Sequence, residues 1–249
     1  MRVAVVTGAG TGIGAASARL LAANGCAVIL VGRREQQLRD TAAELDRAQV
    51  VVADLEEPDA PRRVVDAALA EFGRIDILVN NAAVIHNGAF DSFTLDDFDR
   101  HVAVNLRAPF FLTQAALPAL REGDSPAVIN ISSSIGSIVK PGTTLYAVTK
   151  AALEYLTRAN AFELASWGIR VNAIAPGPVD TPIHATYADD LEAEYQDLAR
   201  RIPLQRMGHV QDIARWVWWL SSPDSDWTTG NVIHVDGGQV LGLPESAGG

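Results

Sequence analysis

The sequence has 249 residues, of which 48% are hydrophobic and 20% charged, and this composition is typical of a globular chain rather than a disordered one. A formal net charge of -10 argues against nucleic-acid binding. The single cysteine, Cys26, excludes an internal disulfide, and no stretch approaches the length of a membrane span. We expect a cytoplasmic protein with no metal site and with neither a nucleic-acid nor a membrane partner.

A glycine-rich turn follows the first predicted strand. The buried strand over 3–6 runs directly into this turn and then into an Ala/Leu-rich helix that continues to about residue 24. Glycines permit a tight turn and let the backbone approach a pyrophosphate, whose charge is met by free N–H groups and by the positive end of the helix. The arrangement predicts a dinucleotide site that includes Gly8, Gly10, Thr11, Gly12 and Gly14.

Two arginines follow the second predicted strand, 27–31, and precede a helix over about 35–46. An acidic residue here would bind the adenosine ribose hydroxyls, whereas an arginine can pair bidentately with a 2′-phosphate. Arg33 and Arg34, with no acid before Glu35, therefore favour NADP(H) over NAD(H). Two points oppose this preference: Thr11 stands where a basic residue would have helped, and both arginines also fit solvated positions at a helix start.

A third strand, 49–53, ends at Asp54 and Leu55. The Asp54 side chain is placed either to contact an adenine amino group or to cap the turn before Pro58. A helix over about 60–72 follows, so strands and helices alternate along this half of the chain. This alternation predicts an α/β fold with a parallel sheet.

The fourth strand, 75–79, opens into Asn80 and Asn81. These asparagines either tie neighbouring strands together or contact the ligand. Further along, the polar Asn105 interrupts the apolar character of a helical region over 94–121. A polar side chain in a helix that should face the sheet is expected to bend the helix and to hold water.

The fifth strand, 127–131, ends at three serines, at the edge where doubly wound sheets bind ligands. Tyr146 and Lys150 follow, four residues apart in a predicted helix, so the phenol and the ammonium lie on one face. An adjacent cation favours the phenolate by roughly one to three pKa units, which would bring the Tyr146 proton within reach of exchange near neutral pH. This spacing is common on helices and gains meaning only from the rest of the chain.

The sixth strand, 169–174, ends in a rigid turn that contains Pro176 and Gly177. Segment 183–208 mixes charged and apolar residues and predicts an amphipathic substrate lid. Together with the loops 84–93 and 136–145, this segment is expected to form the substrate pocket. The candidate wall residues are His86, Phe90, Val139, Leu145, His184 and Tyr187.

A final helix over about 210–222 carries Trp216, Trp218 and Trp219, and a last strand, 231–235, follows it. Three indoles within four positions cover more than one face of a helix. They predict either an oligomer contact or core packing.

Several of these features recur in one order along nearly the whole chain: Thr7-Gly8-x-x-x-Gly12-Ile13-Gly14, Asn80-Asn81-Ala82, Asn105, Ser133, Tyr146-x-x-x-Lys150, Pro176-Gly177 and Asp236-Gly237-Gly238. In this order they resemble the short-chain dehydrogenase/reductase family, in the type of this chain length that includes the 3-oxoacyl reductases. The resemblance implies a single Rossmann-type domain over 1–249, with a doubly wound, seven-stranded parallel sheet flanked by helices, and a homotetramer. Ala83 stands where the family usually has glycine and would narrow the cofactor floor.

The resemblance also implies roles for four residues. Tyr146 would be the general acid/base, and Ser133, which has the family's spacing to that tyrosine, would donate a hydrogen bond to the substrate oxygen. Lys150 would lower the Tyr146 pKa and bind the nicotinamide ribose, and Asn105 would hold a water that links Lys150 to solvent. Further residues expected in the cofactor cleft are Ile13, Asn81, Ala82, Val179 and Thr181.

We therefore expect an NAD(P)-dependent oxidoreductase that interconverts a small ketone and a secondary alcohol. Reduction of 3-oxoacyl groups on a carrier protein ranks lower, because an acidic carrier needs a basic rim, whereas Glu122, Asp124 and Trp167 are expected near the mouth. Two alternatives remain: an NAD-dependent sugar or cyclic-diol dehydrogenase, and a catalytically silent NADP(H)-sensing protein. The sensor is disfavoured because Ser133, Tyr146 and Lys150 are all present.

Overall fold

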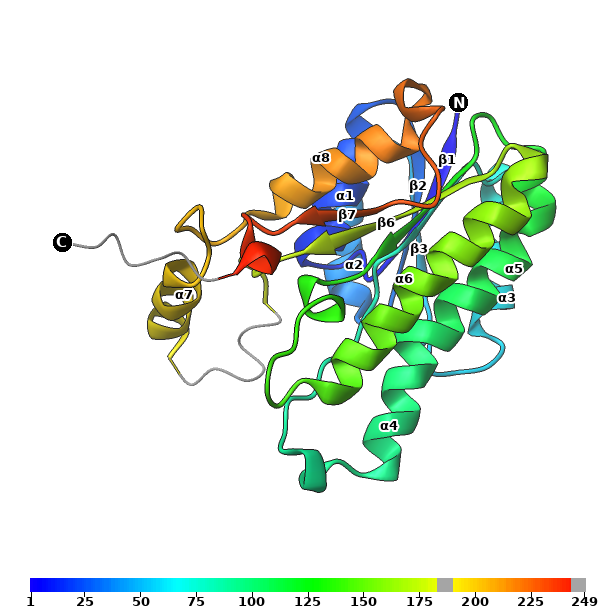
Figure 1. The fold of residues 1–249 in the computed structure, drawn as a ribbon. Coiled ribbons are helices and arrows are strands. Elements are labelled where there is room, and N and C mark those ends of the chain that lie inside the picture. Colours follow the sequence, from blue (N-terminus) through cyan, green and yellow to red (C-terminus); the bar gives the residue numbers. More distant parts are fainter. Residues whose placement is uncertain (183–189, 243–249) are drawn as a thin grey trace.

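The computed structural model describes residues 1–182 and 190–242, which form a twisted sheet with helices on both faces (Figure 1). Its seven strands are all parallel and follow the order β3-β2-β1-β4-β5-β6-β7. The chain thus builds outward from β1 in one direction and then, from β4, in the other. This order confirms the predicted single-domain, doubly wound Rossmann fold.

The central strands are Val/Ile/Ala-rich and buried along their length, as expected when helices cover both faces of a parallel sheet. They are β1 (Val3–Thr7), β2 (Ala27–Gly32), β4 (Ile77–Asn80), β5 (Ala127–Ile131) and β6 (Arg170–Pro176). The edge strands β3 (Ala48–Val52) and β7 (Val232–Val235) are less buried. Alternate residues of each strand enter opposite cores: Val3 and Val5 face one, Ala4 and Val6 the other.

Two helical layers supply the other walls of these cores. One layer, with Leu21, Leu38 and Val217 in its core, contains α1 (Gly12–Ala23), α2 (Glu35–Ala42) and α8 (Val210–Ser221). The other contains α3 (Ala60–Phe72), α5 (Ala108–Arg121) and α6 (Thr144–Leu164), which lie side by side in Figure 1. Among the described residues, no helix has both the length and the apolar character needed to cross a membrane.

Helix α2 ends at Ala42, earlier than the expected end near Asp46. After Ala42 the backbone tightens, because the Glu44 and Leu45 N–H groups bond to the carbonyls of Thr41 and Ala42, three residues back. Most other element boundaries differ from the predicted ones by one or two residues, as helix and strand ends commonly do.

The helix changes type at Asn105. Helix α4 (Leu95–Val102) begins with a reciprocal cap between Thr94 and Asp97. It passes into a π-helical turn, Ala103–Arg107, and α5 follows without a break. Such a turn holds one more residue than an α-helical turn and is frequent at functional sites.

A chain of polar side chains ties the sheet to the helices of one face. Asn80 Nδ2 donates to Asn130 Oδ1 at 2.8 Å, and Asn130 Nδ2 donates to Thr157 Oγ1 of α6 at 2.9 Å. Asn81 Nδ2 donates to the Thr7 carbonyl at 2.8 Å and so joins the ends of β4 and β1. Both asparagines of the Asn80-Asn81 pair therefore tie neighbouring strands, while contact of Asn81 with a ligand, the other alternative, stays a prediction.

Replacing the middle of this chain should cost stability. We expect Asn130→Ala to lower the free energy of unfolding by about 2–4 kcal/mol, because it leaves the buried Asn80 amide and Thr157 hydroxyl with fewer partners. Urea unfolding measures the difference. The matched control is Asn24→Ala, whose exposed amide bonds only the Leu20 carbonyl within the described residues and which should change stability by less than about 0.5 kcal/mol. Equal effects of the two substitutions would contradict the assignment.

Candidate active site

A cavity of about 620 Å³ lies where the carboxyl ends of the strands meet. Of the predicted catalytic residues, Ser133, Tyr146 and Lys150 line it, whereas Asn105 stands behind the wall. All the predicted cofactor residues except Gly14 belong to the cavity lining that the described residues form. The others in the wall are Gly8, Gly10, Thr11, Gly12, Ile13, Arg33, Arg34, Asp54, Leu55, Asn81, Ala82, Pro176, Gly177, Val179 and Thr181.

The glycine turn between β1 and α1 is built by close backbone approach. Gly8 and Gly12 have positive φ angles of 65° and 56°, which side chains rarely tolerate. At Gly14 a Cβ would collide with the Gly8 carbonyl oxygen and, at 2.5 Å, with the Asn81 amide nitrogen. Gly14 therefore shapes the turn from behind, although it does not reach the cavity.

The turn fits an anionic group such as a pyrophosphate. Helix α1 begins at Gly12 with no acidic residue in its first turn, and its N-cap residue, Thr11, makes no side-chain hydrogen bond to its N–H groups. The positive end of the helix dipole and these N–H groups thus face a cavity in which nothing on α1 competes for them. The residues present therefore suit a dinucleotide.

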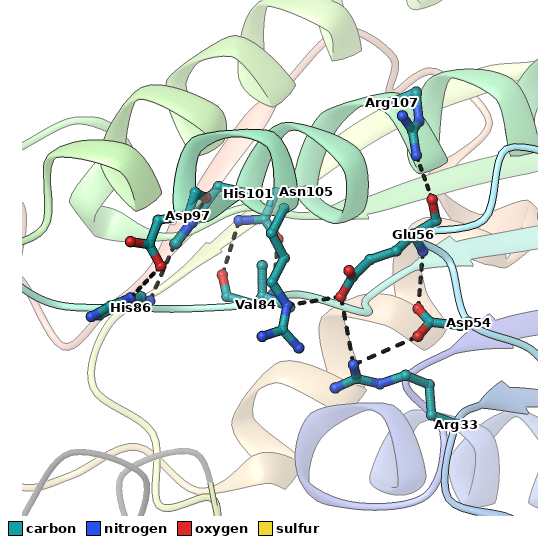
Figure 2. Close-up of polar contacts among 10 residues, drawn as sticks. Arg33, Asp54, Glu56, Val84, His86, Asp97, His101, Asn105 and Arg107 are labelled. Atoms are coloured by element: carbon teal, nitrogen blue, oxygen red, sulfur yellow. Dashed lines mark hydrogen bonds and ion pairs between the residues drawn. The ribbon is translucent and has the colours of Figure 1, made fainter. Parts of the chain in front are cut away.

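A network of charges surrounds Arg33 at one end of the cavity (Figure 2). Arg33 lies 3.8 Å from Asp54 and 3.6 Å from Glu56, and its side chain is half exposed. Glu56 is also paired with Arg100 of α4 at 2.8 Å. Asp54 accepts a hydrogen bond from the Glu56 N–H at 3.0 Å, so it caps a turn while it faces the cavity. Arg33 is therefore positioned to bind a phosphate group, but its guanidinium is already paired with two carboxylates.

Tyr146 and Lys150 project from α6 to one side, as their spacing predicts. The Lys150 side chain is 1% exposed, and its Nζ donates a 2.7 Å hydrogen bond to the Ile131 carbonyl at the end of β5. It lies 5.5 Å from the centre of the Tyr146 ring. The ammonium thus joins α6 to β5, beside the phenol.

The acidities of this pair differ from the expected ones. Burial raises the pKa of Tyr146 to about 12, against a smaller lowering by its hydrogen bond with Ser133. Burial lowers the pKa of Lys150 to about 8, and the Glu154 carboxylate opposes part of that change. The predicted net lowering of the Tyr146 pKa is not seen in the protein alone, because loss of water around the phenol raises this pKa.

A buried carboxylate beneath the serine loop escaped the sequence analysis. Glu154 is 6% exposed and accepts a 2.8 Å hydrogen bond from Ser132 Oγ. A Cβ added to Gly136 would lie 2.8 Å from Glu154 Oε1, so the loop after Ser133 packs closely on this carboxylate. The only signal in the sequence is the spacing, since Glu154 follows Lys150 by one helical turn.

Asn105 joins three parts of the structure. Its Oδ1 accepts from the Val84 N–H at 2.9 Å, and its Nδ2 donates to the Val84 carbonyl at 3.0 Å and to Thr149 Oγ1 at 3.1 Å. Thr149 immediately precedes Lys150, and Val84 belongs to the loop after β4. The side-chain amide expected to hold water is thus engaged by protein groups.

The argument from an acidic mouth is wrong. The Asp124 N–H donates to Asp76 Oδ1 at 2.6 Å, and its carbonyl accepts from Arg2 Nε at 3.0 Å, which places it at the amino ends of β1, β4 and β5. Trp167 lies nearby, with Arg121 stacked on its ring at 3.5 Å. Residues that precede a parallel strand lie at the edge opposite the cavity, and Glu122 and Asp124 precede β5.

The expected pocket walls are reproduced in part. His86 lines the cavity, whereas Phe90 and Val139 are exposed elsewhere and Leu145 is not part of the described lining. His184 and Tyr187 lie outside the described residues, as does the first part of the predicted lid over 183–208. From the rest of that segment, Leu198 of α7 (Leu191–Arg200) reaches the lining. Lining residues that the sequence analysis missed include Gln37, Arg100, Lys140 and Gln239.

Comparison with known proteins gives the same picture over nearly the whole chain. The family model described as Enoyl-(Acyl carrier protein) reductase matches residues 8–239. The 3-oxoacyl-[acyl-carrier-protein] reductase FabG of Thermotoga maritima is 34% identical over 245 residues, which cover 96% of this chain and 98% of the relative.

Solved structures agree. A 3-ketoacyl-(acyl-carrier-protein) reductase from Brucella melitensis, complexed with NADH, is 33% identical with a TM-score of 0.90, over 96% of this chain and 98% of that one. A blue fluorescent protein from a metagenomic library, in complex with NADPH, is 36% identical with a TM-score of 0.87, over 96% and 97% of the two chains.

The chain belongs to the short-chain dehydrogenase/reductase family. It is an enzyme of the class that interconverts alcohol and carbonyl groups with NADP or NAD.

Proposed function

We propose that the protein reduces a small ketone to a secondary alcohol, and catalyses the reverse reaction, with Tyr146 as the general acid/base. The observation that carries this proposal is the meeting of Ser133, Tyr146 and Lys150 in one cavity with the glycine turn. A bound nicotinamide dinucleotide supplies or accepts the hydride.

Each of the three side chains then has one task. Tyr146 Oη gives a proton to the carbonyl oxygen in reduction and removes it in oxidation. Ser133 Oγ donates a hydrogen bond to the same oxygen and stabilises the developing alkoxide. The Lys150 ammonium favours proton release from Tyr146 and binds a ribose hydroxyl. With a pKa near 12, Tyr146 is protonated at neutral pH, which suits carbonyl reduction.

Asn105 is assigned a supporting role in proton replacement. Its side-chain amide fixes the Val84 backbone and Thr149, the residue before Lys150. We infer that this bracing, together with the widened turn, keeps a water-sized place beside Lys150 through which the proton is replaced from solvent.

NADP(H) is proposed as the preferred cofactor. Arg33 and Arg34 line the cavity just after β2, and no acid stands at that strand end to repel a 2′-phosphate. Asp54 and Glu56 oppose the preference by compensating the Arg33 charge. We infer that a 2′-phosphate displaces them, since it offers Arg33 a bidentate partner.

Two other substrate classes remain candidates. Reduction of a 3-oxoacyl group is supported by relatives of that name, and the correction at Asp124 removes the argument against it. An NAD-dependent sugar or cyclic-diol dehydrogenase uses the same site with the other cofactor. The silent sensor is no longer supported, because the chain belongs to a family of enzymes.

We also propose that copies of the chain associate, up to the expected homotetramer. Large exposed apolar side chains gather on α5 and α6, namely Phe110, Phe111, Tyr155 and Phe162. Of the three tryptophans on α8, Trp216 and Trp218 pack against the core and Trp219 is 39% exposed, so this helix offers less apolar surface.

The predicted cytoplasmic location remains a prediction.

Removing the phenol tests the catalytic assignment. We expect Tyr146→Phe to lower kcat for ketone reduction by about 10²- to 10⁴-fold, the range usual for a general acid, and to leave NADPH binding nearly unchanged. Steady-state oxidation of NADPH and fluorescence titration measure the two quantities. The control is Tyr155→Phe on the exposed face of the same helix, and turnover retained in Tyr146→Phe would refute the assignment.

Removing an arginine tests the cofactor preference. We expect Arg33→Ala to weaken NADPH binding by about 10- to 100-fold, as for the loss of one charge-assisted contact, and to leave NADH binding little changed. Arg39→Ala is the matched control, since Arg39 is paired with Glu35 on the outside of α2. An unchanged NADPH affinity in Arg33→Ala would show that the phosphate is bound elsewhere.

The Lys150 pKa predicts a pH profile. Below pH about 8 the ammonium is present, and above it the charge is lost, so kcat for reduction should fall as pH rises through about 8. Glu154→Gln keeps an acceptor for Ser132 but removes the charge that raises the Lys150 pKa, so the alkaline fall should move to lower pH. The control is Glu163→Gln, exposed on the same helix. An unmoved profile in a folded Glu154→Gln variant would contradict this electrostatic role.

A further inference from the structure

A ladder of polar side chains holds the loop after β4 against helix α4 (Figure 2). Asp97, His101 and Asn105 stand at four-residue spacing on α4 and the π-helical turn, and each bonds this loop. Asn105 exchanges two hydrogen bonds with the Val84 backbone, at 2.9 and 3.0 Å. His101 Nε2 accepts from the His86 N–H at 3.2 Å, and Asp97 Oδ1 lies 2.7 Å from His86 Nδ1. The loop is therefore held at both Val84 and His86.

The ladder also fixes the orientation of the His86 ring. An ionised carboxylate only accepts hydrogen bonds, so His86 Nδ1 carries a hydrogen and donates it to Asp97. Two further bonds from Thr94 and the one from His86 hold the pKa of Asp97 well below its usual range. The His86 and Phe93 rings pack in a T-shaped arrangement, with centroids 6.0 Å apart. His86 Nε2 is left with no hydrogen-bond partner among the described residues.

The free side of this ring belongs to the catalytic cavity. His86 is 54% exposed at its side chain and lines the same cavity as Ser133 and Tyr146. The neighbouring Asn87 also lines it, and its Oδ1 is buried without a hydrogen-bond partner in the described part of the chain. Lys140 enters the lining from the loop before α6, which is joined to this one by the Gly88 N–H···O Gly142 bond of 2.9 Å.

The pattern of donors and acceptors selects the ligand group. His86 Nε2 accepts a hydrogen bond when the ring is neutral and donates one when it is protonated, whereas Asn87 Oδ1 accepts and the Lys140 ammonium donates. A hydroxyl group both donates and accepts, so it can satisfy either kind of partner. A carboxylate would place a further hydrogen-bond acceptor near Asn87 Oδ1 and the charged Asp97, and these groups would repel it. An alkyl group would bury His86 Nε2 without a hydrogen-bond partner, which costs free energy of binding.

We propose that His86, oriented by Asp97, binds a hydroxyl group of the substrate, so that the enzyme prefers hydroxylated ketones and the matching diols. This inference rests on the proposed ketone reduction and assigns its substrate class. His86 takes no part in proton transfer to the carbonyl. It acts as a specificity determinant on the wall beside the reacting atoms.

The test compares two methyl ketones on the same carbon tether, one ending in methyl and one in hydroxyl, with NADPH as the donor. In the wild-type enzyme kcat/KM should favour the hydroxylated ketone. His86→Phe keeps the ring edge on Phe93 and removes the nitrogen, so it should lower kcat/KM for the hydroxylated ketone by about tenfold, the size of one hydrogen bond, and leave the other within about twofold. His86→Ala should act in the same direction.

The matched control is His234→Ala, whose Nε2 bonds Ser137 at 3.0 Å and which is not part of the described lining. It should leave the hydroxyl preference unchanged. Equal losses on both ketones in His86→Phe would overturn the proposal. A third ketone on the same tether ends in a carboxylate and tests whether His86 binds that group instead. If His86→Phe lowers kcat/KM for this ketone alone, the hydroxyl assignment is wrong.

A second readout does not depend on turnover. Ligand-detected NMR measures the affinities of a diol and of a matched mono-alcohol for two proteins saturated with NADP. One protein is Tyr146→Phe, and the other carries both Tyr146→Phe and His86→Phe. The proposal is supported if Tyr146→Phe binds the diol more tightly than the mono-alcohol and the double variant does not. This result would support the hydroxyl site even if the enzyme reduced no ketone, and only the proposed reaction would then be refuted. Equal binding of both alcohols to Tyr146→Phe would refute the hydroxyl site.

Discussion

The site depends on a lysine ammonium that is held away from water. Lys150 is 1% exposed, and the hydrogen-bond partner of its Nζ is the neutral carbonyl of Ile131. Burying a cation is expensive unless charges and dipoles nearby compensate it. The carboxylate of Glu154, one turn further along the same helix, offsets part of that cost and also bonds Ser132. The end of β5, the serine loop and α6 thus form a single unit, and Ser133 and Tyr146 are positioned by it.

The same burial explains why the tyrosine does not follow the simple spacing rule. Loss of water lowers the pKa of Lys150 to about 8 and raises that of Tyr146 to about 12, in opposite directions because one group is charged when protonated and the other when deprotonated. The ammonium also points to the Ile131 carbonyl and not to the phenol oxygen. The protein alone therefore keeps the proton on Tyr146, and a positive charge added beside the phenol would act against this state.

Much of the fold and of the site could be predicted from sequence because local rules decide them. Strand–helix alternation gives the parallel sheet, and parallel strands bring Gly8, Asn81, Ser133 and Gly177 to one edge. Partners far apart in sequence were not predictable: no local pattern indicates that Asn105 bonds Val84 and Thr149, or that Glu154 bonds Ser132. The wrong placement of Asp124 at the mouth of the cavity was avoidable from the sequence. Asp124 precedes β5, and the start of a parallel strand lies at the edge of the sheet opposite the cavity.

Asn105 links the two halves of the cavity wall through one helix. Its side chain holds Val84 of the loop that carries His86, and it holds Thr149 beside Lys150. Asp97 and His101 fix the rest of that loop from the same face of α4. The π-helical turn widens the helix at this point, which lets an amide reach both α6 and the loop from one position. His86, the residue proposed to bind a substrate hydroxyl, and Lys150, the residue proposed to assist proton transfer, are therefore positioned by a common support, and a shift of this helix would displace both together.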